Sequence, residues 1–185
     1  CAEPVWEEEP RMSGVEFSGT QTLGTVLDQV GDHCKPEWLC VMEAGECLDP
    51  AVLSDCYEYS RRHSECKLVY CDDDRVDEGN DLFDPRFKPD FNLELLRGSD
   101  YIGNAFLVSY FALLNAGGFG ALDGALHLDL VLRVHDRFGP RSIGHHADIS
   151  FHRRGNASED NPEEWLARRQ RSIQQHLGRR GDLAS

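Results

Sequence analysis

The chain has 185 residues, 40% of them hydrophobic, and a formal net charge of -14 at pH 7. This length suits one folded domain with a small appended element and is too short for two complete domains. The excess of carboxylates argues against a nucleic-acid or anionic membrane surface, since both need clustered Lys and Arg. The ligand is therefore expected to be neutral, or an anion that binds together with a divalent metal.

The sequence contains no apolar run long enough to cross a bilayer and does not begin like a signal peptide. We therefore expect no transmembrane segment and a location in the cytoplasm, which includes the inner face of the membrane. The seven cysteines include no C-x-x-C pair, which favours buried, reduced thiols over a zinc site. Because the chain opens on Cys rather than Met, we expect a piece of a longer protein.

Hydrophobic periodicity predicts the elements of the first part of the chain. Apolar residues recur at helical spacing before Gly31, and the pair Asp49-Pro50 marks the start of a second helix. The expected elements are a strand at residues 15–17, a helix at 20–30, a strand at 38–42, a helix at 50–61 and a strand at 67–71. Alternating helices and continuously apolar strands are typical of a parallel sheet covered on both faces.

The second part of the chain continues this α/β pattern after a loop-rich stretch at residues 79–100. The expected elements are a short helix near 93–96, a strand at 101–108, helices at 110–115 and 125–137, a strand at 147–151 and a helix at 162–177. We therefore expect an α/β domain with a mostly parallel central sheet at residues 1–157. A helical extension at 158–185 packs on this domain or follows it.

Acidic residues follow two of the predicted strands. The sequence E-A-G-E at residues 43–46 follows one strand, and three consecutive aspartates at 72–74 follow the next. Ligands of parallel sheets bind at the carboxyl ends of the strands, so both groups are expected at one edge. Adjacent like charges are usually retained where a cation, a sugar or a basic partner neutralises them.

Six short motifs resemble those of family 2 glycosyltransferases of the polysaccharide and O-antigen type. The family shows Y-S-D-E-D, F-K-P-D, N-Y-I-G, G-G-F, D-Y-D-L-V-L-R and Y-H-W-R in this order. Here the corresponding runs are Y-C-D-D-D, F-K-P-D, D-Y-I-G-N, G-G-F, L-H-L-D-L-V-L-R and F-H-R-R, and the resemblance covers about residues 36–180. It implies a partial GT-A fold, because the family's first β-α-β unit, which holds the base and ribose, is absent from this sequence.

The resemblance implies transfer of a sugar from a nucleotide sugar to a glycan or lipid-linked acceptor during polysaccharide biosynthesis at the cell envelope. Without the nucleotide-binding unit we expect the isolated chain to be inactive and to act with that unit or with adjacent domains. The alternative is a non-catalytic domain of the same fold, serving in glycan binding or assembly. Several departures from the family motifs leave this alternative open.

The resemblance also implies donor-side residues. Glu43 and Glu46 stand where the family has a metal-binding D-x-D-D motif, so they are candidate ligands for Mg²⁺ or Mn²⁺ and the donor diphosphate, or simply solvated carboxylates. His152 matches the histidine of Y-H-W-R and is a further candidate for the metal and the diphosphate. Arg154 is a candidate phosphate contact or a solvated residue at the end of a strand.

His127 stands where the family has its catalytic base, and Asp129 matches the second aspartate of that motif. An imidazole can accept a proton near neutral pH, but a histidine on an apolar helix is more often a packing residue. On the acceptor side, Asp72 and Asp74 line the site or brace the neighbouring loop through Arg75 and Lys88. The complete set implied for the acceptor side is Asp72, Asp74, Lys88, Asp90, Tyr101, Asn104 and Gly118.

Overall fold

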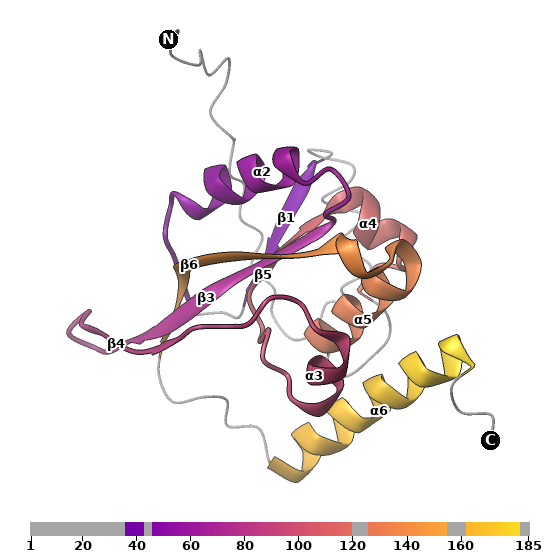
Figure 1. Cartoon of the computed structure of the whole chain (residues 1–185). Helices are drawn as coiled ribbons and strands as arrows, with labels where there is room; N and C mark the ends of the chain where they lie inside the picture. Colours follow the sequence, from indigo (N-terminus) through magenta and orange to yellow (C-terminus); the bar gives the residue numbers. More distant parts are fainter. Residues whose placement is uncertain (1–35, 43–45, 120–125, 155–161, 182–185) are drawn as a thin grey trace, which may run out of the picture.

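The computed structural model describes residues 36–42, 46–119, 126–154 and 162–181. The described part is an α/β structure in which helices cover both faces of one curled sheet (Figure 1). The strand expected at residues 15–17 and the helix expected at 20–30 lie outside the described residues. No helix in the described part is both long and apolar enough to cross a membrane.

Six strands form the sheet. They are β1 (Trp38–Val41), β2 (Cys47–Leu48), β3 (Leu68–Val76), β4 (Leu82–Arg86), β5 (Phe106–Ser109) and β6 (Ile143–Arg154). Their order is β1-β5-β3-β6-β2, and β4 pairs with β3 outside this path. Only β3 and β6 run parallel among the described strand pairs, while the other pairs are antiparallel. The expectation of a mostly parallel sheet is therefore wrong, because a strand covered on both faces is apolar whichever way it runs.

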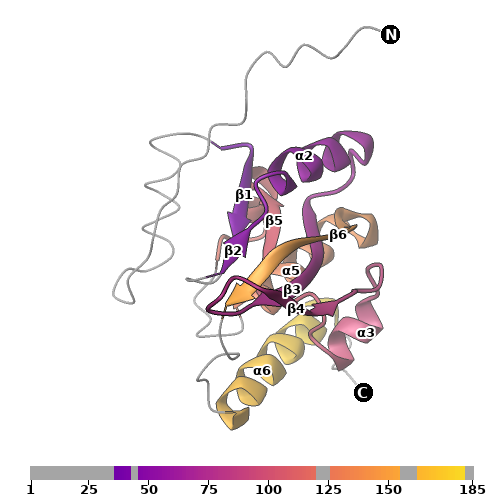
Figure 2. The same cartoon turned by 90° about the vertical axis from the view of Figure 1, so that its left-hand side faces the viewer.

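One helix, α2 (Val52–Arg62), covers one face of the sheet, and the remaining helices gather on the other side (Figures 1 and 2). These are α3 (Leu93–Gly98), α4 (Tyr110–Asn115), α5 (Leu126–Phe138) and the C-terminal α6 (Pro162–Arg180), with a 3-10 turn η1 (Pro140–Ser142) before β6. The expected C-terminal helix is thus confirmed. The boundary proposed at residue 157 stays a prediction, since residues 155–161 lie outside the described residues.

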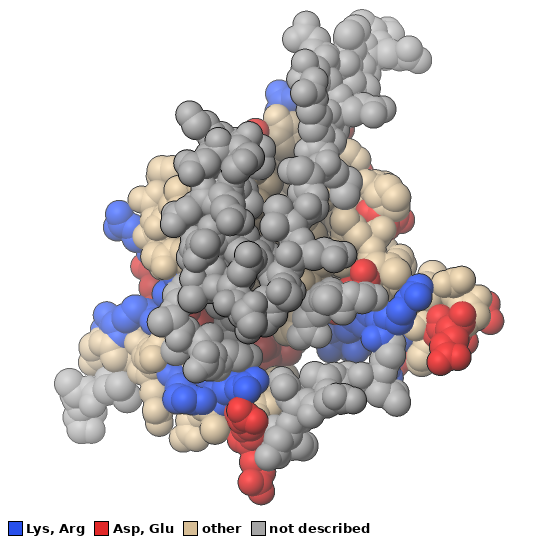
Figure 3. Space-filling view, turned by 180° about the vertical axis from the view of Figure 1, so that it is seen from behind, with Lys and Arg blue, Asp and Glu red and all other residues tan. Residues whose placement is uncertain are grey.

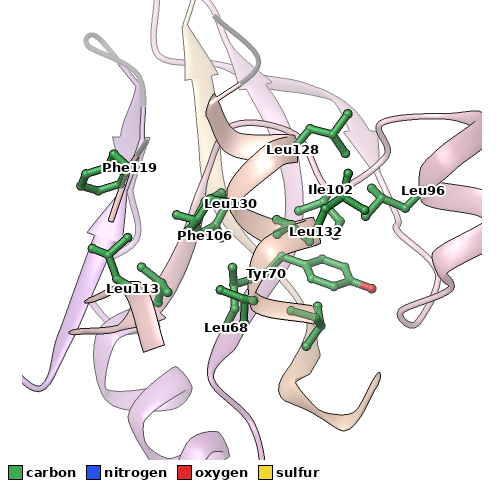
Figure 4. Packing of buried hydrophobic residues seen from close by; sticks show 14 residues of the cluster. Leu68, Tyr70, Leu96, Ile102, Phe106, Leu113, Phe119, Leu128, Leu130 and Leu132 are labelled. Carbon is green, nitrogen blue, oxygen red and sulfur yellow. The ribbon is translucent and has the colours of Figure 1, made fainter. Parts of the chain in front are cut away.

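The larger apolar cluster lies between the sheet and α3, α4 and α5 (Figure 4). Leu68 and Tyr70 of β3 and Phe106 of β5 are fully buried against α5 residues such as Leu130 and Leu132. Truncating a fully buried leucine of this kind costs about 2–5 kcal/mol. The Tyr70 hydroxyl points to the margin of the cluster and donates a hydrogen bond to the Pro89 carbonyl at 2.6 Å.

A second cluster lies under α2. Val52 and Cys56 of α2 pack on Val69 and Cys71 of β3, and the Cys56 and Cys71 sulfur atoms are 3.7 Å apart. The five described cysteines are free thiols, and three of them, Cys56, Cys66 and Cys71, are buried.

Two strands are longer than the hydrophobic pattern predicts. β3 continues past Cys71 through the three aspartates to Val76, and β6 runs over 12 residues instead of the expected five. β4 falls in the stretch at residues 79–100 that was expected to be loop, where Pro85 argued against a strand; its first four residues are exposed. The aspartates consequently lie inside a strand that has neighbours on both sides, and not beyond its end.

Candidate functional site

Asp72, Asp73 and Asp74 are all buried, with relative exposures of 4%, 3% and 4%. Burying three adjacent carboxylates is costly unless each one is paired and hydrogen-bonded. In the structure each aspartate has a different set of partners, drawn from segments on both sides of β3.

Asp73 is surrounded by three cations. Arg86 donates to its two carboxylate oxygens at 2.7 and 2.6 Å, the planar pairing that guanidinium groups favour. Lys88 Nζ lies 2.7 Å from one oxygen, and Arg153 Nε donates to the other at 2.7 Å. Burial raises the pKa of the Asp73 carboxyl, but the hydrogen bond from Arg86 and the charge of Lys88 outweigh it, so the pKa is below its ordinary value.

Asp72 holds the segment that follows β4. Its Oδ1 accepts a hydrogen bond from the Lys88 backbone N–H at 2.8 Å and lies 2.9 Å from His145 Nε2. The other ring nitrogen of His145 is 3.2 Å from Asp90 Oδ1. The F-K-P-D segment is therefore tied to β3 and β6 through one buried carboxylate.

Asp74 pairs with His152 across the parallel β3–β6 contact, where its Oδ1 lies 2.6 Å from His152 Nδ1. The β6 strand carries extra residues opposite Cys71–Asp72 and Asp72–Asp73, where the register shifts. Such bulges break the regular alternation of side chains between the two faces. They let successive aspartates reach partners at different places on β6.

The expected donor-side residues that the structure describes lie close together. Cys47 of β2 is the register partner of His152, and Glu46 directly precedes it. Arg154 Nη2 lies 3.7 Å from the Cys47 sulfur and 3.3 Å from Asn80 Oδ1. Glu43 lies outside the described residues.

The described residues do not form a site for the expected Mg²⁺ or Mn²⁺. No group of three or more His, Cys, Asp or Glu side chains within the described ranges is arranged to hold a metal. His152 Nδ1 is engaged by Asp74, and Asp73 is engaged by cations on both oxygens. The metal-binding role of Glu43, Glu46 and His152 stays a prediction.

His127 and Asp129, the expected catalytic residues, lie on α5 with different surroundings. The His127 ring meets the Phe106 ring edge-on at 5.8 Å, and burial lowers the His127 pKa to about 4. Asp129 is 1% exposed and accepts a hydrogen bond from Arg133 Nε at 2.6 Å. Among the described residues, His127 thus contacts Phe106 of β5, and Asp129 contacts Arg133 of α5 and Arg179 of α6, away from the β3 aspartates.

The turn after α4 depends on Asp129 through Arg133. Arg133 Nη1 donates to the carbonyls of Ala116 and Gly118, so the guanidinium joins α5 to this turn. Gly117 and Gly118 have φ angles of 89° and 68°, which glycine adopts without the strain that a side chain would cause. Gly118 therefore shapes the backbone at the position where the resemblance implies an acceptor contact.

Tyr101, from the Y-I-G-N motif, lies near the F-K-P-D segment, which contacts the same Tyr70. The Tyr101 ring meets the Tyr70 ring at 6.0 Å in an edge-on contact, and the Tyr101 hydroxyl accepts from the Asn92 backbone N–H at 2.9 Å. Asn104 stands just before β5 and is partly buried. Pro89, Tyr101 and His145 thus surround Tyr70 at the margin of the larger core.

Sequence reasoning missed two residues that organise this site, His145 and Arg153. His145 was overlooked because the last strand was expected to begin at residue 147, whereas β6 begins at Ile143. Arg153 was considered only as a replacement for the family's tryptophan. One of the two roles expected for Asp72 and Asp74 was to brace the neighbouring loop through Arg75 and Lys88, and Asp72 does bind the Lys88 backbone. The partners on β6 depend on its pairing with β3, which no local pattern predicts.

Basic and acidic side chains are interspersed on the described surface seen from behind (Figure 3). The net negative charge of the chain therefore does not produce a uniformly acidic surface on that face.

The chain is similar to two much longer proteins. It is 30% identical over 184 residues to the O-antigen biosynthesis protein RfbC of Myxococcus xanthus, a match that covers 96% of this chain and 14% of that protein. It is 26% identical over 178 residues to the uncharacterized protein y4gI of Sinorhizobium fredii (strain NBRC 101917 / NGR234), covering 93% of this chain and 20% of that protein. No family model matches the chain. The chain spans a fifth or less of either relative.

Proposed function

We propose that this chain is part of a GT-A glycosyltransferase of family 2, which transfers a sugar from a nucleotide sugar to a glycan or lipid-linked acceptor in polysaccharide biosynthesis. The six ordered motifs support this proposal. The similarity to a protein named for O-antigen biosynthesis supports the same pathway class. Because the relatives are several times longer, the activity is proposed for the whole protein that contains this chain.

One observation carries the proposal: motif residues from separate segments of the chain contact one another. Asp72 of the Y-C-D-D-D run binds the backbone of Lys88 in the F-K-P-D run. Asp74 contacts His152 of the F-H-R-R run, 78 residues away in the sequence. Residues that resemble a family only by chance would have no reason to lie together in space.

Under this proposal the site has two sides. The acceptor side comprises Lys88, Asp90, Tyr101, Asn104 and Gly118. Glu46, His152 and Arg154 form the donor side, where Arg154 is a charge-assisted donor for a phosphate oxygen. No step of the proposed reaction is assigned to a divalent cation, since the described residues do not form a site for it.

Neither of the two α5 residues expected at the catalytic centre is well suited to accept the proton of the acceptor hydroxyl. His127 is neutral at pH 7, as a base must be, but its pKa of about 4 makes it a weak one. Asp129 is engaged by Arg133, and in this proposal it shapes the turn at Gly118 instead of taking a proton.

A second candidate function is a non-catalytic glycan-binding domain of the same fold. The contact of the partly buried His127 with Phe106 and the internal pairing of Asp73 and Asp129 favour it, because these groups then serve stability alone. Fold resemblance cannot separate the two functions.

The test is release of nucleoside diphosphate from a panel of UDP-, dTDP- and GDP-sugars with Mn²⁺. It compares the 185-residue chain with the longest natural polypeptide that contains it. We expect the longer polypeptide to release nucleoside diphosphate in the presence of a glycan acceptor and the shorter chain to release none. If the longer polypeptide neither turns over nor binds any donor at millimolar concentration, the non-catalytic function is the better account.

A further inference from the structure

Each residue of the segment 88–90 contacts a residue of the sheet. The Lys88 backbone N–H binds Asp72, and Lys88 Nζ donates to the Ile102 carbonyl at 2.8 Å. The Pro89 carbonyl accepts the Tyr70 hydroxyl, and the Asp90 carboxylate contacts His145. These contacts therefore fix the segment in one conformation.

His145 is the centre of this arrangement. Its side chain is 5% exposed and its two ring nitrogens face two different carboxylates, Asp72 at 2.9 Å and Asp90 at 3.2 Å. The ring also stacks on Tyr70, with 4.8 Å between centroids and an interplanar angle of 15°. Stacking and two polar contacts together leave the imidazole no freedom to turn.

Asp90 differs from the three aspartates of β3 in its exposure. Its side chain is 98% exposed, whereas those of Asp72, Asp73 and Asp74 are buried. An exposed carboxylate normally samples several rotamers and loses entropy when it binds a ligand. Here the contact with a buried, immobile imidazole reduces that loss in advance.

We infer that Asp90 binds a hydroxyl group of the glycan acceptor and that His145 is the positioning residue that orients Asp90 for this contact. A carboxylate accepts strong, charge-assisted hydrogen bonds from neutral hydroxyls. The inference rests on the proposed function, from which the acceptor side is taken. His145 acts through Asp90 and does not touch the sugar itself.

The experiment measures binding of a panel of methyl glycosides of hexoses, deoxyhexoses and acetamidohexoses to the full 185-residue chain by saturation-transfer NMR. We expect Asp90→Asn to weaken binding about tenfold, the loss typical of a hydrogen bond to a charged group. Asp55→Asn, which makes the same charge change on exposed α2, is the matched control and should bind like the wild type.

Two substitutions of His145 separate positioning from packing. His145→Phe keeps a ring to stack on Tyr70 but removes both polar contacts, so binding should weaken about tenfold. His145→Asn places an amide where Nδ1 now faces Asp90, and should restore most of the binding. The melting temperature of each variant is also measured. If His145 served packing alone, His145→Asn should be less stable and bind more weakly than His145→Phe, because Asn has no ring to stack on Tyr70.

Tyr70→Phe provides a test that does not depend on His145 variants folding. It leaves the aromatic ring in the core and frees only the Pro89 carbonyl, so binding should weaken by roughly threefold. Binding as strong as that of the wild type in Asp90→Asn, or in both His145→Phe and Tyr70→Phe, would overturn this inference but not the proposed function. A wild type that binds none of the glycosides also overturns it, whereas the proposed function is judged separately by donor turnover.

Discussion

Asp73 and Lys88 form an ion pair of 2.7 Å in which the two side chains are only 4% and 3% exposed. Burial lowers the pKa of Lys88, so the ammonium group depends on this carboxylate for its charge. The same carboxylate also binds Arg86 and Arg153. One aspartate thus neutralises cations from β4, the following segment and β6, and fixes their relative positions.

Asp73→Asn should destabilise the protein by about 3–5 kcal/mol, because it leaves a buried lysine and two arginines without their shared carboxylate. Urea unfolding at pH 7 measures this loss. Asp84→Asn is the control, since Asp84 is 60% exposed and lies 4.0 Å from Arg75, a pair of the kind that contributes at most about 1 kcal/mol. Equal stability of the two variants would contradict the central role of Asp73.

The difference in stability between the wild type and Asp73→Asn should be smaller in acid. The folded state lowers the Asp73 pKa below its ordinary value, so the stabilisation is present above about pH 4 and is lost as the pH falls through the folded pKa. The gap between wild type and Asp73→Asn should therefore shrink between pH 5 and pH 3. A gap that stays constant over this range would show that the ionised carboxylate is not its source.

Gly144→Ala should destabilise the protein by about 1–3 kcal/mol through overpacking. A Cβ at Gly144 of β6 would lie 2.6 Å from Tyr59 Cε1 and 2.8 Å from the Cys66 sulfur. Thermal unfolding measures the effect. Gly98→Ala, at the end of α3 with no atom within 4 Å of the added Cβ, should leave stability unchanged. A larger loss of stability in Gly98→Ala than in Gly144→Ala would contradict the close packing of Gly144 against Tyr59 of α2.

His127 should make stability depend on pH. Burial lowers its pKa to about 4, while an unfolded histidine has a pKa of about 6.5. The unfolded chain therefore binds a proton first, and the free energy of unfolding should fall from pH 6.5 to pH 4 by roughly 3 kcal/mol at most.

His127→Phe keeps an aromatic contact with Phe106 and removes the titrating group, so its stability should change less over the same range. Urea unfolding at pH 6.5 and pH 4.5 tests this, with His63→Gln on the exposed end of α2 as the control. An unchanged pH dependence in His127→Phe would mean that His127 is not buried in solution.

The attachment of α6 should depend on His176, whose side chain is fully buried. Its Nδ1 lies 2.8 Å from Asp136 Oδ1 on α5, and its Nε2 lies 2.9 Å from Arg97 Nη2 on α3. His176→Ala should cost about 2–4 kcal/mol and speed amide exchange in α6. Arg171→Ala, at an exposed position of the same helix, should change neither measurement.

Local pattern was enough to predict several elements. The helix expected at 110–115 matches α4 (Tyr110–Asn115), and the one expected at 125–137 matches α5 (Leu126–Phe138) to within one residue at each end. Helical periodicity is a property of neighbouring residues, so the sequence carries it directly. The resemblance likewise pointed to Asp72, Asp74, Lys88 and His152, and in the structure Asp72 contacts Lys88 while Asp74 contacts His152.

Strand direction and strand length were decided by tertiary structure. β3 could be recognised by its apolar start, but its extension through three aspartates to Val76 depends on β4 and β6 supplying arginines on either side. No local pattern predicts a strand across three adjacent negative charges. For the same reason the mixed sheet could not be foreseen, because the antiparallel β5 is as apolar as its neighbours.

The sequence by itself therefore determined the helices, the apolar strands and the identity of the acidic residues at the site. Only the tertiary structure decided what those residues contact, since the partners of Asp73 and Asp72 on β6 are 80 and 73 residues away along the chain. The physical reason is that the cost of burying a carboxylate depends on the charges that folding brings beside it, and not on its neighbours in the sequence.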